Sequence, residues 1–301
     1  METKRIYRVK NWNAYNNSLI QRGSLELYID QNALKSWKAQ PEGKPGHQKE
    51  YSDVAIQTLL MIRKAFHLRL RQTQGFVKSI FKMLKIELKV PNYSIISRRS
   101  GKLNLQLPKN NKEKVYAILD STGLKVFGEG EWKVRKHGYS KRRTWKKLHI
   151  AIDADGEIRA CELTDNTIDD AEMVNSLTQE DKPIIEKFLG DGAYDKKKVY
   201  QQFDKHTLMI VPPRVDAQKG LHLYRDANIS QIEQYTLENW KILTDYHKRS
   251  LVETTMFRLK TIFGDKLFAQ NSDNQITKAN IMCALLNKMS ALGMPQSYTI
   301  T

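Results

Sequence analysis

Five short apolar runs in the second part of the chain limit the folds that it can adopt. The runs cover residues 115–120, 148–153, 158–163, 184–189 and 208–211. Their length and their β-branched and aromatic residues predict strands. The second and third runs flank Ala154-Asp155-Gly156, which is typical of a tight hairpin turn. Three strands in a meander, followed by two that alternate with helical segments, predict an α/β fold with a mixed five-stranded sheet flanked by helices.

Two of these predicted strands end at an aspartate. Asp120 closes the first run, and Asp191 follows the fourth run between two glycines. In an open α/β sheet the ligand crevice lies outside such strand ends. Most acids after a strand are turn or cap residues, and we expect this of most of the others: Asp153, Asp155, Asp165, Asp169 and Asp195. Asp120 and Asp191 therefore indicate a metal site only if a third acid lies close to them.

The third acid lies on a predicted amphipathic helix. Its spacing, Tyr246-x2-Arg249-x3-Glu253-x6-Lys260, places these side chains within roughly 60° of one another on a helix. A second stripe of the same helix is apolar and consists of Val252, Met256, Leu259 and Phe263. Alone, Glu253 would be a solvated partner of Arg249. Three converging acids would instead bind two Mg2+ ions, the arrangement that supports in-line displacement at phosphorus.

These segments resemble the three catalytic motifs of the DDE transposases of bacterial insertion sequences. The segments are Asp120-Ser121-Thr122, Gly190-Asp191-Gly192-Ala193-Tyr194-Asp195 and the spacing from Tyr246 to Lys260. The third segment is similar to the Y-(2)-R-(3)-E-(6)-K signature of the insertion-sequence-five family, without a departure. The resemblance covers the chain from about Tyr15 to Leu292.

The resemblance implies a ribonuclease-H-like core and the residues of its site. The implied metal ligands, and catalytic residues, are Asp120, Asp191 and Glu253. They would hold two Mg2+ ions, for which Mn2+ can substitute, and no nucleotide cofactor is implied. The residues that would contact DNA phosphates or order the site are Tyr246, Arg249 and Lys260.

The implied activity is that of a metal-dependent DNA transposase, both endonuclease and strand transferase. Such an enzyme binds the terminal inverted repeats of its double-stranded DNA element and hydrolyses phosphodiester bonds at the element ends. It then joins the 3′-hydroxyl ends to target DNA. Because two ends must be paired during this reaction, the resemblance implies a homodimer in the synaptic complex.

Other outcomes stay open at this point. Only 61 residues, positions 192 to 252, separate Asp191 from Glu253, so the insert that we predict at about 214–240 is small. Whether the DNA ends pass through hairpins is therefore open. A transposase-derived repressor would bind DNA without catalysis, and a ribonuclease-H-like nuclease would cut without strand transfer. The intact acids argue against the repressor, and the signature from Arg249 to Lys260 favours a transposase over the nuclease.

The charge of the chain indicates a polyanionic partner. Fifty Lys and Arg oppose 33 Asp and Glu, giving a formal net charge of +17. Such an excess favours a polyanion through counterion release, and by itself it is also compatible with binding to a membrane surface or a ribosome. No apolar run approaches the roughly 18 residues of a membrane span, so we expect no membrane partner. Two distant cysteines, Cys161 and Cys283, exclude a disulfide framework and a structural zinc site. We expect a reducing bacterial cytoplasm, with association to the nucleoid during action.

Residues 1–112 are predicted to form a mainly helical DNA-binding and dimerisation region with a linker, and residues 113–301 the catalytic domain. Helical spacing at 54–66 and 75–84 precedes a short cationic segment with Arg98 and Arg99. These helices could form a helix-turn-helix that reads a DNA groove, or a small helical domain with a solvated basic face.

A second basic stretch lies between residues 133 and 149, where cations alternate with tryptophan and tyrosine. Cations seat phosphates and aromatic rings stack on unpaired bases, so this stretch predicts DNA contact. The alternative is a solvated hairpin connection in a basic protein. The candidate DNA-contacting residues here are Arg135, Lys136, Arg142, Arg143 and Lys146.

Overall fold

The computed structural model describes residues 6–41, 43, 48–105, 107, 112–126 and 145–300. The chain forms two compact units. The first unit comprises Met1–Asn104 together with Ala284–Thr301, and the second comprises Leu105–Cys283. This division differs from the predicted one, in which residues 113–301 together form the catalytic domain. The last residues group with the N-terminal unit because the two ends of the chain pair as strands.

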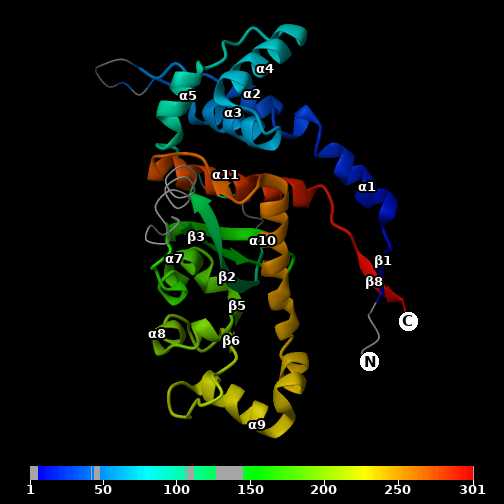
Figure 1. Ribbon diagram of the computed structural model, residues 1–301, viewed down its shortest axis with the longest axis vertical. Coiled ribbons are helices and arrows are strands. Elements are labelled where there is room, and N and C mark those ends of the chain that lie inside the picture. The colour runs from blue at the N-terminus through cyan, green and yellow to red at the C-terminus, as the bar shows by residue number, and fades with distance from the viewer. Residues whose placement is uncertain are drawn as a thin grey trace, which may run out of the picture. The chain divides into compact units, whose positions relative to one another are not determined.

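A mixed sheet forms the centre of the second unit and confirms the predicted fold class. In the part of the chain that the structure describes, its five main strands lie in the order β4-β3-β2-β5-β6 (Figure 1). The bounds are β2 Val115–Val126, β3 Trp145–Ile152, β4 Ile158–Asp165, β5 Ile185–Leu189 and β6 Leu208–Ile210. Strands β2, β3 and β4 pair antiparallel, whereas β5 and β6 run parallel to β2. A two-residue strand that the sequence did not reveal, β7 (Lys266–Leu267), pairs with the far end of β2.

Strand β2 is longer than predicted. The apolar run predicts an end at Asp120, but β2 continues to Val126, paired with β3 and, at its last two residues, with β7. The polar residues Ser121 and Thr122 conceal this second half, since an apolar run marks only a strand that is buried on both sides. Asp120 therefore lies inside β2 and not at its end.

Helices cover the sheet of the second unit. Their bounds are η2 Asp170–Glu172, α7 Val174–Thr178, η3 Lys182–Ile184, η4 Gly192–Tyr194, α8 Lys197–Tyr200, α9 Leu223–Leu243, η5 Tyr246–Arg249, α10 Ser250–Phe263 and α11 Ser272–Ala291, the last of which continues into the first unit. Among the helices of the described residues, none is both long and apolar enough to cross a membrane.

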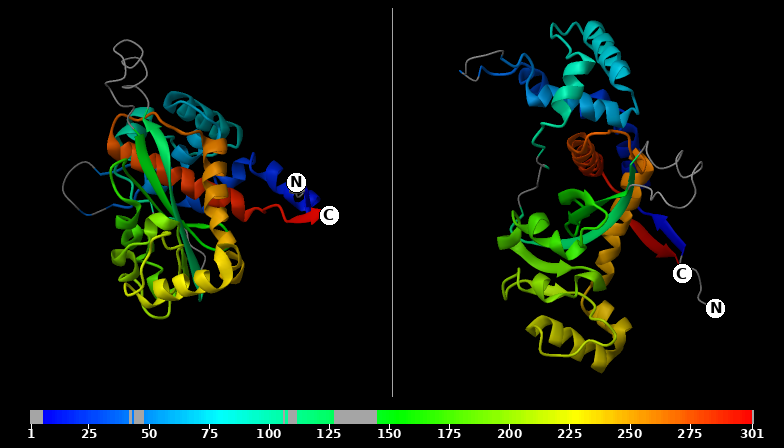
Figure 2. Two further views of the ribbon diagram at one scale, coloured as in Figure 1. Left: turned by 60° about the horizontal axis from the view of Figure 1, so that its bottom comes forward. Right: turned by 60° about the vertical axis from the view of Figure 1, so that its left-hand side comes forward.

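Alternate residues of β2 face opposite sides of the sheet. Val115, Ala117 and Leu119 belong to a buried cluster with residues of α7 and α8. Ile118 and Asp120 point to the other side, along which α10 runs in contact with β2 (Figure 2). The apolar stripe predicted on this helix is buried, as expected: Val252, Met256, Leu259 and Phe263. Burial of that stripe holds the neighbouring polar edge of α10 beside Asp120.

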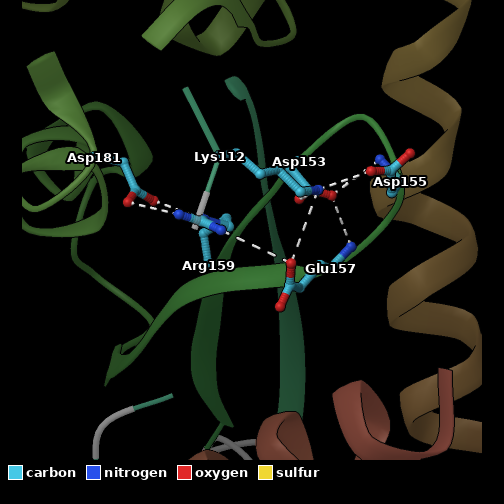
Figure 3. Close-up of polar contacts among 6 residues, drawn as sticks. All are labelled: Lys112, Asp153, Asp155, Glu157, Arg159 and Asp181. Carbon is cyan, nitrogen blue, oxygen red and sulfur yellow. Dashed lines mark hydrogen bonds and ion pairs between the residues drawn. The ribbon is translucent and has the colours of Figure 1, made fainter. Parts of the chain in front are cut away.

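The turn between β3 and β4 is held by a charged network, which Figure 3 shows. Asp153 is 1% exposed, and its Oδ1 accepts hydrogen bonds from the backbone N–H groups of Asp155 (2.9 Å) and Glu157 (3.0 Å). Lys112 Nζ contacts Asp153 and lies 2.7 Å from Asp155 Oδ2. Arg159 Nη1 lies 3.8 Å from Glu157 Oε2. A buried carboxylate needs such partners. Asp153 and Asp155 are therefore turn residues, as predicted.

Helix α9 corrects a second expectation. Residues 214 to about 235, within the predicted small insert, are polar and lack a regular apolar pattern, which favours irregular structure; the residues from Leu223 onward are instead helical, with a break at Thr236 (φ 74°, ψ 157°). The anchors of α9 are polar and buried: Arg225 Nε donates to Asp195 Oδ1 (2.7 Å), and Asn228 Nδ2 donates to the Met209 carbonyl (2.9 Å). A pattern of apolar residues cannot detect a helix that is held by buried polar contacts.

The predicted catalytic helix begins differently from expectation. The spacing predicts one helix that begins at Tyr246, whereas the structure has a 3-10 turn, η5, followed by α10. Asp245, just before η5, has a left-handed backbone (φ 59°). Tyr246 and Arg249 therefore lie on η5, and Glu253 and Lys260 lie on α10.

The first unit is mainly helical, as predicted. Its elements are β1 Ile6–Val9, α1 Trp12–Gln21, η1 Leu25–Leu27, α2 Gln31–Lys35, α3 Asp53–Ala65, α4 Leu70–Met83, α5 Tyr93–Ser100 and β8 Ser297–Ile300. Helices α3, α4 and α5 pack together, with Ile56, Val77 and Ile96 fully buried. Ser52 caps α3 by accepting a hydrogen bond from the Ala55 N–H (3.1 Å). The two-stranded ribbon of β1 and β8 was not predicted.

Candidate active site

The pairing of β2 with β5 brings Asp120 and Asp191 together. The last residues of this parallel pair are Ile118 and Leu189. Asp120 and Asp191 each lie two residues further along, so the register places them side by side at the point where the two strands part. A shift of two residues also keeps the face of the sheet. The predicted convergence of these two acids therefore follows from strand register.

Each aspartate uses one carboxylate oxygen locally. Asp120 Oδ1 accepts a hydrogen bond from the N–H of Ser121 (2.8 Å). Asp191 caps η4, where its Oδ1 accepts from the N–H of Ala193 (2.9 Å). These bonds fix the orientation of both carboxylates. The second oxygen, Oδ2, of each faces Arg249, at 3.5 Å for Asp120 and 3.9 Å for Asp191.

Arg249 joins all three acids. Its Nη2 lies near the two aspartates, and its Nη1 donates to Glu253 Oε1 one helical turn further on. The side chains of Arg249 and Asp120 are 18% and 19% exposed, whereas those of Asp191 and Glu253 are 41% and 55% exposed. The site is thus a half-buried floor, Asp120 and Arg249, under a more open rim.

The surroundings in the site shift the pKa values of its ionisable side chains. Burial raises the pKa of Asp120, and the neighbouring charges of Asp191 and Glu253 raise it further, against the Ser121 N–H and Arg249, which lower it. Burial also raises the pKa of Tyr246 to about 12, and its ring packs 5.3 Å from that of Trp240. Such perturbations cluster at functional sites.

The donor set fits a hard divalent cation, although the acids are not spaced as a ready metal cage. Three carboxylates supply the oxygen ligands that Mg2+ and Mn2+ prefer, and the described site offers them no soft sulfur ligand. Among the residues that the structure describes, no three His, Cys, Asp or Glu side chains lie close enough together to hold a metal ion. In this conformation the three acids surround the Arg249 guanidinium instead.

Other predicted DNA-contacting residues have varied surroundings. Lys260 is half-buried on α10, two turns beyond Glu253. Lys146 is only 15% exposed, with its Nζ 3.1 Å from Ser272 Oγ and 3.3 Å from Asp165 Oδ1. The other four candidates of that basic stretch lie outside the described residues: Arg135, Lys136, Arg142 and Arg143.

The two candidate cations of α5, in the first unit, differ from each other. Arg98 is exposed and available to a ligand. Arg99 is 17% exposed and bonds within the unit, to the Tyr51 carbonyl and the Asp53 carboxylate. Arg99 therefore stabilises the packing of α5 on α3 in this structure.

Sequence reasoning missed a second charged group behind Asp120. His149, fully buried on β3, is the cross-strand partner of Ser121. Its Nδ1 lies 3.3 Å from Asp170 Oδ1, and Lys147 Nζ also lies 3.3 Å from that oxygen. Contact with His149 above all lowers the pKa of Asp170 to about 2. The pairing of β2 with β3 was the signal that could have found this group, but its register is not legible in the sequence.

Tyr194 is a further residue of the site that the sequence did not distinguish. Its side chain is 1% exposed, and its hydroxyl has no hydrogen-bond partner among the described residues. The ring packs over the backbone of Gly190, where a Cβ would lie 2.7 Å from Tyr194 Cδ2. The glycine before Asp191 is therefore required by this close approach.

Comparison with known proteins bears on the same part of the chain. A family model described as "Transposase DDE domain" matches residues 111–288, which is more than half of the chain. A second model with the same description matches residues 20–129. No solved structure matches the chain. The larger match spans β2 through most of α11, and thus contains every residue of the carboxylate site.

Proposed function

The chain belongs to the family of transposases with a DDE domain, and on that premise we propose that it moves a bacterial insertion sequence by cutting and rejoining DNA at the element's ends. Membership implies a DNA-binding enzyme of phosphoryl transfer. We further propose that it recognises terminal inverted repeats and belongs to the insertion-sequence-five group with the Y-R-E-K signature. The observation that carries the proposal is the convergence of three acids from β2, the end of β5 and α10 on one guanidinium.

The three acids are proposed to hold two divalent ions, Mg2+ or Mn2+. Asp120 and Asp191 are oriented by backbone N–H groups, and Glu253 is positioned by the packing of α10. When bound, the ions supply activation of the attacking oxygen and stabilisation of the leaving oxygen. The role of the chain is to present ionised carboxylates at fixed positions beside the DNA backbone.

Cations and the tyrosine along the same edge are proposed to contact the DNA. Tyr246, Arg249 and Lys260 lie on η5 and α10, next to or beyond Glu253. Positive side chains at this place neutralise the charge that develops on a transferring phosphoryl group. The first unit, with exposed Arg98 on α5, is proposed to bind the element's ends, and two chains are proposed to pair in the synaptic complex.

The experiment measures binding and cleavage separately. Purified chain is given double-stranded DNA that carries the terminal inverted repeat, with Mg2+, Mn2+ or chelator. We expect cleavage only with either metal, followed by joining of the 3′-hydroxyl ends to a target duplex. Asp120→Asn, Asp191→Asn and Glu253→Gln should each reduce cleavage by a factor of at least about 10^3, since each removes a proposed ligand, and should leave DNA binding in a mobility-shift assay.

Asp204→Asn serves as the control, because Asp204 is an exposed acid outside the site. It should cleave like the natural chain. Binding without metal-dependent cleavage would identify a transposase-derived repressor and contradict the proposal. Cleavage without joining would identify a nuclease and contradict the strand-transfer step.

A further inference from the structure

The Arg249 guanidinium lies where the three acids of the site meet. Its Nη1 contacts Glu253, and its Nη2 lies 3.5 Å from Asp120 and 3.9 Å from Asp191. Its Nε is buried and has no partner in the described part of the chain. One positive charge therefore faces three carboxylates, through the two terminal guanidinium nitrogens, Nη1 and Nη2.

Three carboxylates this close to one another repel, and two of the four charged groups are largely shielded from water. A cation between them offsets the repulsion. Guanidinium suits this task because it stays charged at every physiological pH and offers several N–H donors in one plane. Without a divalent ion, Arg249 is thus the counterion of the site.

We propose that Arg249 is an internal counterion that competes with divalent metal for the three acids, and that a DNA phosphate releases it by offering another anion. The proposal rests on the proposed function, because it assumes that these acids bind the catalytic ions. It assigns Arg249 a role before DNA arrives, in addition to phosphate contact afterwards. The pairing would keep metal affinity low in the free chain and so limit cutting of unrelated DNA.

The geometry favours release of the guanidinium. Only the contact with Glu253 is close, and Glu253 is 55% exposed. The Glu253 end of this ion pair is therefore open to water, which weakens the attraction. Arg249 is also the last residue of the four-residue turn η5, and not part of a long helix. Its side chain can therefore turn toward a phosphate without unfolding α10, while the Oδ1 bonds keep both aspartates in place.

Competition has a thermodynamic consequence. If Arg249 leaves the acids when DNA binds, DNA and metal must each raise the affinity for the other by the same factor. Removing the guanidinium removes the competitor, so metal should bind tightly even to the free chain. The coupling between DNA and metal should then disappear.

The test titrates Mn2+ into the full chain without DNA and follows free Mn2+ by electron paramagnetic resonance. Arg249→Gln should bind Mn2+ about tenfold more tightly than the natural chain. Lys248→Gln is the matched control: it removes the neighbouring positive charge, whose Nζ lies near Asp245 and the Tyr116 ring and not near the acids. That variant should bind Mn2+ with unchanged affinity. Equal or weaker binding by Arg249→Gln, or equal tightening by both variants, would overturn the proposal.

A second measurement uses only the natural chain and so does not depend on how a variant folds. A duplex that ends in the terminal repeat should raise the Mn2+ affinity about tenfold, and an affinity independent of DNA would contradict the inference. Two further variants, Glu253→Gln and Asp120→Asn, distinguish a failure of the proposed metal site from a failure of the proposed role of Arg249. If both variants bind Mn2+ as the natural chain does, the proposed metal site itself fails. If both lose Mn2+ binding but Arg249→Gln gains none, only the role of Arg249 fails.

Discussion

Asp170 shows how one residue can matter to the site without belonging to it. Its carboxylate lies against the buried ring of His149 and the ammonium of Lys147, directly behind the strand that carries Asp120. The same residue reads in the sequence as one of two acids at a helix start, and the neighbouring Asp169 does cap η2. The sequence could not distinguish Asp169 from Asp170, because the two residues are of the same type and differ only in what their side chains contact in the fold.

The lowered pKa of Asp170 makes a pH-dependent prediction. The pKa of Asp170 in the fold is about 2, below the ordinary aspartate pKa of 3.8, so Asp170 stabilises the fold above about pH 4, and this contribution is lost as the pH falls toward 2. Asp170→Asn should lower the free energy of unfolding by about 1–2 kcal/mol at pH 7. Denaturant titrations from pH 7 to pH 3 should show this difference shrinking below pH 4.

The control for this prediction is Asp216→Asn, at an exposed loop position. It should change the free energy of unfolding by less than about 0.5 kcal/mol. A difference between Asp170→Asn and the natural chain that stays constant down to pH 3 would contradict the assignment.

Among the elements, the turn after β5 is the one on which the site depends most. Residues 190–195 end the strand, place Asp191 as the cap of η4 and turn the Tyr194 ring back over Gly190. The β2–β5 register then brings this turn beside Asp120. Gly190, Asp191 and Tyr194 therefore act together to shape this turn, although in the sequence they are only part of a short motif.

A substitution at Gly190 tests this dependence. Gly190→Ala would place a methyl group 2.7 Å from Tyr194 Cδ2, so the ring or the turn must move. We expect a loss of about 1–3 kcal/mol in the free energy of unfolding, the usual cost of overpacking. Gly192→Ala is the matched control, because its Cβ would meet only the Pro212 carbonyl at 3.7 Å. Thermal unfolding should separate the two, and equal melting temperatures would contradict the packing argument.

At the scale of the molecule, the two ends of the chain form one structure in the first unit. Strand β1 pairs with β8, and Asn11 ties the segment before β8 to the start of α1. Its Nδ2 donates to the Met294 carbonyl (3.0 Å), and its Oδ1 accepts from the Gln296 N–H (2.7 Å). Figure 1 shows the ribbon that the two ends make. A pairing between the ends of a chain cannot be read from local patterns.

Asn11→Ala tests the attachment of the C-terminal segment. The variant loses two hydrogen bonds, each worth about 1 kcal/mol. Amide hydrogen exchange should become faster in residues 296–300 and stay unchanged in β2 and β3. Asn13→Ala, an exposed neighbour on α1, should leave all of these rates unchanged. Exchange in 296–300 that is indifferent to Asn11→Ala would contradict this role.

The sequence by itself determined the five main strands and the apolar face of α10, and it predicted the three acids of the candidate site. These features are local, because strand and helix periods and a fixed spacing of charged residues are written in consecutive residues. The family match covers residues 111–288, the stretch that contains these features. Two elements that the sequence did not predict, β7 and α9, depend on distant residues. Strand β7 pairs with β2, and α9 is held by buried polar contacts.

Only the tertiary structure decided how the acids are arranged and what balances them. Asp120 proved to lie inside β2 and still meets Asp191, because strand register and not strand length sets their separation. Arg249 appeared in the sequence as a phosphate contact, and in the fold it is the cation that three carboxylates share. The spacing along the helix specifies only the contact with Glu253, whereas the contacts with Asp120 and Asp191 depend on distances and burial that exist only in the folded chain.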